Sequence, residues 1–465
     1  MKIQFLGGAR SVTGSQYLLS VNGSKILLEC GLFQGRRGDT YEKNLSFDYD
    51  PADIDALVLS HAHLDHAGNI PNLCKSGYAK KIFTTSATVD LCQILLRDSA
   101  YLNEKDVEWV NKIRASKNEP PVKPLYTIDD AEESLGHFVG IQYDQPFRVA
   151  PGVTVTFQDA GHILGSACVL LEVEENSRRL RLGFTGDLGR KDMPIIRDPD
   201  PLEDLDALIV ESTYGNRKHE DPSGAEEELA GIITRTVERQ GNVIIPAFAV
   251  GRTQLLIYVI HGLFKRGRIP HIPVYIDSPM ACNAIDIYRA HPECFDRETY
   301  SRVVEGDEDL FTPPGFNCVR KAESSIQLNY LTDPRIVIAA SGMAEGGRIL
   351  HHLKHGVGDE RNTVLFVGFA AEHTLARRLM DGEKDVRIFG ETHRVKCEIV
   401  TMPYFSAHAD RGGILDFVSK SSVRKLKDVF VVHGELEQSE ALRKSLVERG
   451  YRGVVIPERL QVFSL

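Results

Sequence analysis

Short apolar runs separated by polar turns mark the first part of the chain. Residues 1–31 predict three strands, with turns at Gly7-Gly8 and Asn22-Gly23. Residues 54–59 form an apolar run with the length of a buried strand. Further strands are expected at 153–158, 167–173 and 207–211, and two helices are expected within 86–116. This pattern predicts that residues 1–214 form a domain built mainly of strands.

The pattern changes near residue 215. Helices are expected at 224–240, 251–265, 346–354 and 373–380, and strands at 242–246, 272–276, 335–340 and 363–367. Alternating strands and helices favour a largely parallel sheet that is covered on both faces. Strand patterns then resume at 395–402 and 428–432. We predict a second domain at 215–395, inserted into a first domain that consists of 1–214 and 396–465.

A histidine cluster directly follows the apolar run 54–59. The stretch Ser60-His61-Ala62-His63-Leu64-Asp65-His66 leads into a short helix that ends at Gly77. The cluster thus occupies a strand-to-helix turn, where α/β proteins place ligand sites. Imidazole and carboxylate groups together suit zinc. A solvated polar turn is the alternative, but this density of ligands after a buried strand favours metal binding.

Other titratable residues also stand at the ends of predicted strands: Glu29, Asp187, Glu211 and His433. His162 lies between two strands, with glycines on both sides that permit tight turns. An isolated histidine or acid in such a place is usually structural. Here a first metal ion would still lack a third nitrogen, and a carboxylate such as Asp187 can bridge two ions.

Composition narrows the class of protein. The chain has 465 residues, of which 42% are hydrophobic and 26% charged, and this profile is typical of globular domains. The net charge of -10 argues against a generally basic nucleic-acid coat. Eight dispersed cysteines without a CxxC pair fit reduced thiols. With neither a signal peptide nor a membrane-spanning run, we expect a cytoplasmic protein.

The HxHxDH stretch resembles the signature of the metallo-β-lactamase superfamily. The stretches 246–254, 277–281 and 340–348 resemble the β-CASP cap of nucleases that cut RNA or DNA. The implied fold is α/β: a metallo-β-lactamase αββα sandwich with an inserted β-CASP α/β cap domain. Family members usually carry Asp at the position of Glu29 and Gly at the position of His373.

This resemblance implies two zinc ions per chain. One ion would be held by His61, His63, His162 and Asp187, and the other by Asp65, His66, His433 and the shared Asp187. Glu29 would hydrogen-bond to the metal loop from behind, with an ordinary edge acid as the alternative. The catalytic residues would be Asp65, His408 and Glu211, with His408 and Glu211 forming a proton-donor pair.

The three cap stretches each place small residues between a strand end and a helix start. Free backbone N–H groups and the helix dipole make such turns suitable for anions, although any single one is equally well explained as a tight turn. The expected RNA phosphate-binding residues are Gly251, Arg252, Ser278, Ser341, Gly342 and Arg348. In the first domain, we expect Tyr101 and Trp109 to pack the 86–116 segment onto the core, and a surface that stacks on bases is the alternative.

The function that follows is a zinc-dependent ribonuclease acting on single-stranded RNA, in RNA processing or decay. Histidine at position 433 points to the RNA-cutting branch of the family. A hydroxide between two metals would attack phosphorus, and His408 would protonate the leaving 3′-oxygen. The alternatives are a DNA nuclease, a hydrolase of a small molecule and a non-catalytic RNA-binding scaffold. Endonuclease or 5′-exonuclease action, the RNA target, protein partners and a homodimer are left open by the sequence.

Overall fold

The computed structural model describes residues 1–35, 37–306, 308–313, 315–368 and 370–465. The chain divides into two compact units. Unit 1 comprises Met1–Met193, Arg197–Lys218 and His408–Leu465, and unit 2 comprises Pro194–Ile196 and His219–Ala407.

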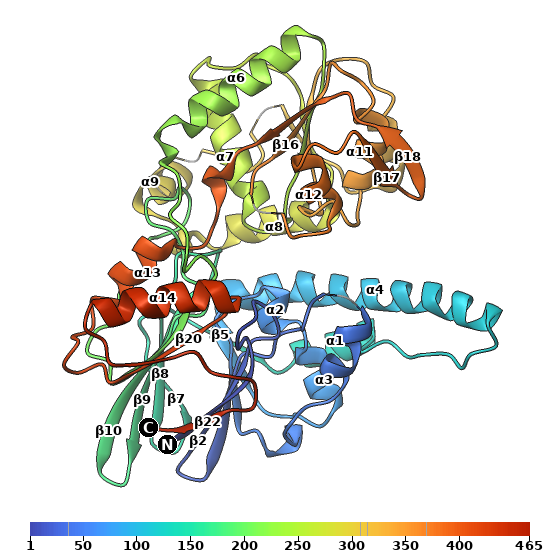
Figure 1. Cartoon of the computed structure of the whole chain (residues 1–465). Helices are drawn as coiled ribbons and strands as arrows, with labels where there is room; N and C mark the ends of the chain where they lie inside the picture. The colour runs from blue at the N-terminus through green and yellow to red at the C-terminus, as the bar shows by residue number, and fades with distance from the viewer. Residues whose placement is uncertain (36, 307, 314, 369) are drawn as a thin grey trace. The chain divides into compact units, whose positions relative to one another are not determined.

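Two seven-stranded sheets form the centre of unit 1 within the described residues (Figure 1). In spatial order, the first sheet contains β22 (Val462–Ser464), β1 (Lys2–Gly7), β2 (Gln16–Val21), β3 (Ser24–Leu28), β4 (Ala56–Val58), β5 (Ile82–Thr85) and β6 (Phe138–Ile141). The second contains β21 (Gly453–Val455), β20 (Asp428–Val432), β11 (Ala207–Glu211), β10 (Arg178–Phe184), β9 (Ala167–Glu175), β8 (Val153–Asp159) and β7 (Phe147–Ala150). The strands predicted at 1–31, 54–59, 153–158, 167–173 and 207–211 are confirmed.

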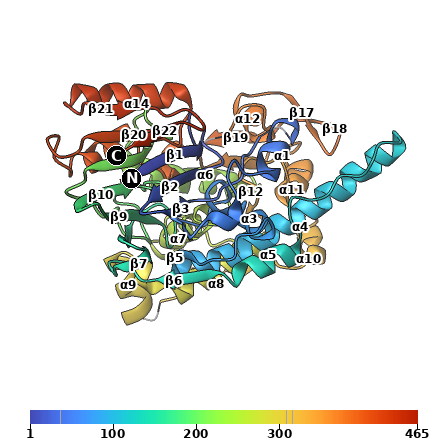
Figure 2. The ribbon, with the colours of Figure 1, turned by 90° about the horizontal axis from the view of Figure 1, so that it is seen from below.

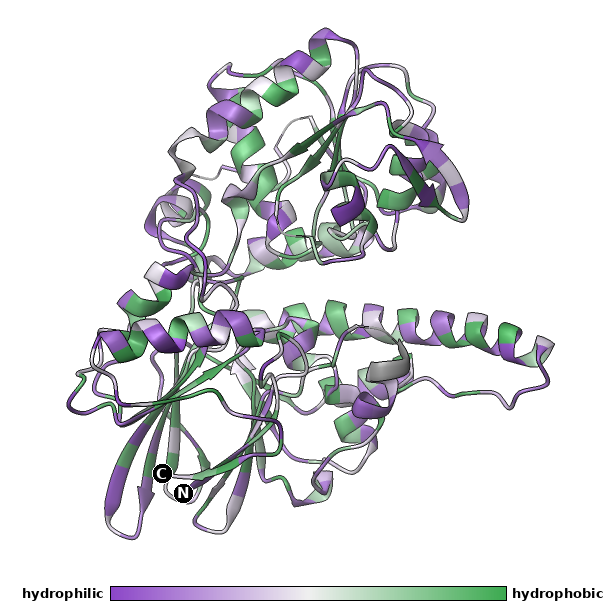
Figure 3. Ribbon diagram, viewed as in Figure 1, coloured by the Kyte–Doolittle hydropathy of each residue, from purple (hydrophilic) through white to green (hydrophobic). Residues whose placement is uncertain are grey.

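The two sheets pack face to face because their strands alternate buried and outward-facing residues, as in β8. The rings of Phe5 and Phe430 lie 5.1 Å apart across this core, and those of Tyr17 and Phe184 lie 5.4 Å apart. Burying each such side chain contributes about 1.5–3 kcal/mol. Figure 3 shows apolar residues along the strands of both sheets.

Helices cover the outer faces of unit 1 and complete an αββα sandwich (Figure 2). Those beside the second sheet are α13 (Arg411–Val418) and α14 (Leu436–Glu448). Those associated with the first sheet are α2 (Leu64–Ala67), α3 (Ile70–Lys75), α4 (Ser86–Ser116) and α5 (Ile128–Leu135); α1 spans Arg37–Leu45. The expected fold class is confirmed.

Helix α4 corrects two expectations. It is one helix of 31 residues where two helices were predicted, and its distal half extends away from the sheets of its own unit (Figure 1; Figure 2). Trp109 is 63% exposed and Tyr101 is 48% exposed, so neither packs onto the core. The segment around Val122 contacts α4 at Asn111, which exchanges hydrogen bonds of 2.9 and 2.8 Å with the backbone of Val122.

Unit 2 contains a six-stranded parallel sheet among its described residues. Its order is β14 (Phe316–Cys318), β13 (Val274–Ile276), β15 (Ile336–Ala339), β12 (Val243–Pro246), β16 (Thr363–Phe366) and β19 (Glu398–Thr401). Its main helices are α6 (Ala225–Glu238), α7 (Arg252–Lys265), α8 (Pro279–Ala290), α11 (Ile349–Gly356) and α12 (Leu375–Met380). The predicted alternation of helices and strands is confirmed.

Strand β19 was expected in the returning part of the first domain, but it belongs to unit 2. It forms a parallel pair with β16, from Thr363 opposite Glu398 to Phe366 opposite Thr401. A strand at a sheet edge has one hydrogen-bonding side to satisfy, and β16 offers the free edge of this sheet. The hairpin of β17 (Asp385–Ile388) and β18 (Glu391–Arg394) was not predicted.

Two further observations concern the cysteines and the length and polarity of the helices. None of the eight cysteines, all of which lie in the described ranges, forms a disulfide. Among the helices that the structure describes, none is both long and apolar enough to cross a membrane.

Candidate metal centre

The histidine motif occupies the turn between β4 and α2, as the sequence predicts. The backbone of residues 30–32 holds this turn, because Cys30 N–H donates to the carbonyl of His66 (2.7 Å) and Leu32 N–H donates to that of Leu64 (2.8 Å). A side chain at Gly31 is excluded, since its Cβ would lie 1.7 Å from the carbonyl oxygen of Asp65. The close contact between the backbone of residues 30–32 and the backbone of the histidine turn therefore fixes the direction of the imidazole side chains.

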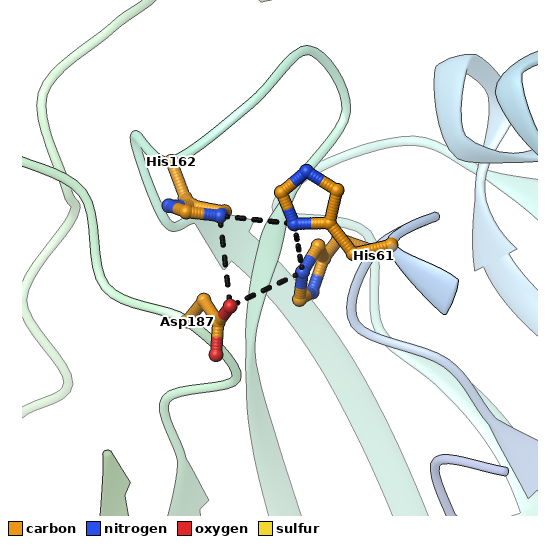
Figure 4. A group of neighbouring side chains, drawn as sticks. His61, His162 and Asp187 are labelled. Atoms are coloured by element: carbon orange, nitrogen blue, oxygen red, sulfur yellow. Dashed lines mark hydrogen bonds and ion pairs between the residues drawn. The ribbon is translucent and has the colours of Figure 1, made fainter. Parts of the chain in front are cut away.

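The first group of candidate ligands combines three loops. His61 and His63 follow β4, His162 lies between β8 and β9, and Asp187 follows β10. His61 Nε2 lies 3.1 Å from His63 Nδ1, and His162 Nε2 lies 3.2 Å from the same atom. Asp187 Oδ2 lies 3.4 Å from His61 Nε2 and 3.5 Å from His162 Nε2. Figure 4 shows the rings of His61 and His162 and the Asp187 carboxylate turned towards one point.

The second group lies on the other side of Asp187. His66 Nε2 is 3.2 Å from His433 Nε2, and Asp65 Oδ2 is 3.4 Å from the same atom of His433. Asp187 Oδ1 is 3.2 Å from ring nitrogens of both His66 and His433. The two oxygens of Asp187 thus face different groups, which is the geometry of a bridging carboxylate.

The donor set fits metal ions. Each group offers ligand atoms that lie within 4.8 Å of one another. Burial lowers the pKa of His61 to about 3 and places that of His162 well below its usual range, so both rings are neutral and can coordinate. Asp187 Oδ1 is buried and accepts no hydrogen bond within the described structure, despite the nearby ring nitrogens. A cation between these groups would satisfy that oxygen.

Glu29 lies behind the ligands and is fully buried. Its Oε2 accepts from His66 Nδ1–H (2.5 Å) and from the Ser60 hydroxyl (2.9 Å), and its Oε1 accepts from Ser60 N–H (2.7 Å). The Ser60 hydroxyl in turn accepts from His61 Nδ1–H (2.9 Å). This relay leaves Nε2 of His61 and Nε2 of His66 available, which is how outer hydrogen bonds orient metal-binding imidazoles.

His408 and Glu211 form a pair beside the cluster. His408 Nδ1 is 3.1 Å from Glu211 Oε1, and its Nε2 faces Asp187 Oδ2 at 4.0 Å. Leu188 N–H and Thr213 N–H donate to the Glu211 carboxylate (2.7 and 3.1 Å). Burial alone would lower the pKa of His408, but the charge and hydrogen bond of Glu211, aided by Asp187, raise it to about 9. The imidazole therefore carries a proton at neutral pH.

Three residues of this region were missed by sequence reasoning: Ser60, Ser166 and Thr213. Ser166 Oγ accepts from His162 N–H (3.0 Å), and Thr213 Oγ1 lies 3.2 Å from His433 Nδ1. Each stands within four residues of a predicted site residue. Their position beside a candidate ligand was the only signal, and a hydroxyl there is too common to be recognised without geometry.

In unit 2, the expected phosphate-binding turns all follow the carboxyl ends of neighbouring strands. Strands β12, β15 and β13 are parallel neighbours, with Pro246 opposite Ala339 and Ile276 opposite Ile338. Their carboxyl ends therefore bring together Gly251 and Arg252, Ser341 and Gly342, and Ser278. The Ser278 hydroxyl caps α8 by accepting from Ala281 N–H (3.2 Å), so it is already engaged within the unit.

Arg348 is held inside unit 2 by protein acceptors. Its Nη1 lies 2.7 Å from Asp277 Oδ1 and 2.8 Å from the carbonyl oxygen of Val319. Asp277 also accepts from Ser325 Oγ and His352 Nε2, each at 2.6 Å. Burial would raise the pKa of Asp277, but these hydrogen bonds lower it overall. The geometry gives Arg348 a structural partner, and its expected phosphate contact stays a prediction.

Replacing Asp277 with alanine is expected to lower the free energy of unfolding by about 1–3 kcal/mol, because it removes the buried carboxylate to which Arg348, Ser325 and His352 donate hydrogen bonds. Urea unfolding followed by circular dichroism measures this. Because the pKa of Asp277 is lowered on folding, its contribution is present above about pH 4 and is lost as the pH falls further. The matched control is Asp381→Ala, which removes an exposed pair with Arg377 and should change little; equal effects of the two variants would contradict the prediction.

His373 has a φ of +68°, in the left-handed region that favours glycine. The backbone thus explains why glycine suits this position.

A buried His/Asp cluster at the strand ends of an αββα sandwich defines a metallo-hydrolase. Three matches to known families agree with this class: the metallo-beta-lactamase superfamily over residues 10–91, the Beta-Casp domain over 253–379, and the Zn-dependent metallo-hydrolase RNA specificity domain over 392–457. The chain belongs to the β-CASP family of the metallo-β-lactamase superfamily.

Similar proteins extend over nearly the whole chain. Ribonuclease TTHA0252 of Thermus thermophilus is 36% identical over 453 residues, covering 97% of both chains. The transcription termination factor FttA of Methanosarcina mazei is 30% identical over 463 residues, covering 97% of this chain and 69% of the factor. A crystal structure of a protein of unknown function from Enterococcus faecalis shares the fold, with a TM-score of 0.55, 13% identity, and coverage of 100% of this chain and 99% of that one.

Proposed function

We propose that this chain is a ribonuclease that hydrolyses phosphodiester bonds of single-stranded RNA with two zinc ions. The observation that carries this proposal is the position of Asp187, whose two carboxylate oxygens each face a separate group of imidazoles. Two metals that share one carboxylate form the clamp that in-line phosphoryl displacement uses.

The residues divide between two ions. His61, His63, His162 and Asp187 would hold one, and Asp65, His66, His433 and Asp187 the other. When bound, the ions lower the pKa of water and neutralise charge that develops on the phosphate. Glu29 orients His66 directly and His61 through Ser60. Asp65 has a side chain that is 22% exposed, so its carboxylate can also hold a water molecule by a hydrogen bond at the open side of the cluster.

His408 supplies the proton for the leaving group. Glu211 accepts from its Nδ1–H and so turns Nε2–H towards the cluster, where the scissile bond would lie. As a water oxygen bonds to phosphorus and the bond from phosphorus to the 3′-oxygen breaks, protonation of that oxygen gives a 3′-hydroxyl and a 5′-phosphate. A general acid placed in this way contributes about 10²–10⁴-fold to the rate.

Two comparisons support RNA as the substrate. The carboxyl-terminal part of the chain matches an RNA specificity domain, and a relative that covers 97% of the chain is named a ribonuclease. Both favour RNA over a small molecule or DNA. Each candidate ligand position carries a histidine or an aspartate, and this also disfavours a non-catalytic RNA-binding scaffold.

Cleavage of end-labelled oligonucleotides tests the proposal. Single-stranded RNA and DNA of the same sequence are incubated with the zinc-loaded protein, with and without a chelator. We expect cutting of the RNA, loss of cutting with the chelator, and recovery on addition of zinc. Cutting of DNA alone would overturn the choice of substrate, and no cutting of either by protein with bound zinc would overturn the nuclease assignment.

A further inference from the structure

An exposed aromatic ring stands at the same sheet edge as the candidate phosphate turns. Phe248 lies two residues after the end of β12 and is 48% exposed. It lies against the loop after β15, because a Cβ built on Gly342 would be 3.1 Å from the Phe248 ring and 3.3 Å from its backbone nitrogen. A larger residue at position 342 would push the ring by a few tenths of an ångström, so the two loops lie in close contact.

The backbone that carries this ring is fixed. Thr253 Oγ1 donates to the carbonyl of Phe248 (2.7 Å), and Ala247 N–H donates to that of Ala339 (3.0 Å). Gln254 Nε2 donates to the carbonyl of Ala249 (3.0 Å). Leaving a phenyl ring in water forgoes the stabilisation that burial would give, yet the fold holds this ring at the surface.

A cationic residue and the start of a helix follow the ring along the chain. The 14-residue helix α7 begins at Arg252, four residues further along, with Gly251 at its N-cap. The Arg252 guanidinium lies beside Gly368 at the end of β16, since a Cβ built there would be 3.6 Å from an Arg252 nitrogen. An aromatic platform next to a cation is the combination that binds single-stranded nucleic acids, with a base on the ring and a phosphate at the cation.

We propose that Phe248 is a binding residue for RNA, on which one unpaired base stacks. This inference rests on the proposed function and names the part of the substrate that unit 2 would hold. A paired base presents no free face to a side chain, so the contact selects single-stranded RNA. The phenyl ring contacts the base face and makes no hydrogen bond, so it accepts any of the four bases.

Tryptophan fluorescence tests the stacking directly. The chain has one tryptophan, Trp109, so a Trp109→Phe background allows a single reporter at Phe248→Trp. The matched control is Phe389→Trp, because Phe389 is 51% exposed in the same unit but lies between β17 and β18. On mixing zinc-loaded protein with single-stranded RNA, we expect saturable quenching at position 248 within the first turnover. We expect little quenching at position 389 or with duplex RNA.

A second pair of variants measures the energetic contribution. Phe248→Ala should raise KM for single-stranded RNA by about 5- to 100-fold, as loss of one stacked base predicts, while Phe389→Ala should leave KM unchanged. Two results together would overturn this inference: unquenched emission at position 248, and an unchanged KM in a Phe248→Ala protein that still cuts RNA. The proposed function would then remain intact. If the wild-type protein neither binds nor cuts RNA, both fall.

Discussion

Replacing Asp187 with asparagine is expected to reduce the rate of RNA cleavage by about 10³-fold or more. The substitution keeps the shape of the side chain but removes the negative charge that faces both groups of imidazoles. One amide oxygen cannot replace two carboxylate oxygens as a bridge. Zinc content should therefore fall from about two ions per chain to one or fewer. Elemental analysis by mass spectrometry and single-turnover cleavage measure the two effects.

Asp159→Asn is the matched control for this variant. Asp159 is also buried in unit 1, where burial raises its pKa to about 7 and Arg197 Nε lies 3.3 Å from its Oδ2. Asparagine can still accept the hydrogen bond from Gly161 N–H that Asp159 accepts now (2.9 Å). We expect wild-type zinc content and activity from this control. An Asp187→Asn protein that kept both ions and the wild-type rate would refute the bridging role.

Removing the imidazole of His408 should slow cleavage by about 10²–10⁴-fold without loss of zinc. His408 is paired with Glu211 and faces Asp187 only at 4.0 Å, so the ligand set should remain intact. His351→Ala, which removes an exposed histidine in unit 2, serves as the control. Loss of zinc in the His408→Ala protein would instead identify this residue as a ligand.

The pH profile tests the same pair. The pKa of His408 is raised to about 9, so the proton donor is present below about pH 9 and activity should decline as the pH rises through that value. Glu211→Gln removes the charge that raises this pKa. The alkaline limb of kcat should therefore move to lower pH. An unmoved limb in the Glu211→Gln protein would show that another group sets it.

The sequence predicted the grouping of the candidate metal ligands well, because most of the patterns that identify them are local. The candidate ligands from His61 to His66 lie within six residues, directly after the strand that positions them. Asp187 and His433 stand far apart in sequence, yet each follows an apolar run, and carboxyl ends of neighbouring strands meet at one edge of a sheet. The pattern of predicted strands and the family resemblance together were sufficient to place these residues in one candidate site.

Features that depend on long-range packing were harder to predict. The exposure of Trp109 depends on which face of α4 the segment around Val122 covers, and the helical pattern alone does not decide this. The partner of β19 depends on which sheet has a free edge. The proton relay through Ser60 requires distances of about 3 Å that no sequence pattern encodes.

Unit 1 joins segments that lie far apart in sequence: β22 pairs with β1, with Ser464 opposite Lys2, and His433 follows β20. During synthesis, the first sheet therefore cannot be completed until residues 462–464 have left the ribosome. Almost all of unit 2, residues 219–407, emerges as one continuous segment and can fold earlier. The candidate metal centre includes His433, so a nascent chain cannot assemble the complete group of candidate ligands before residue 433 has been made.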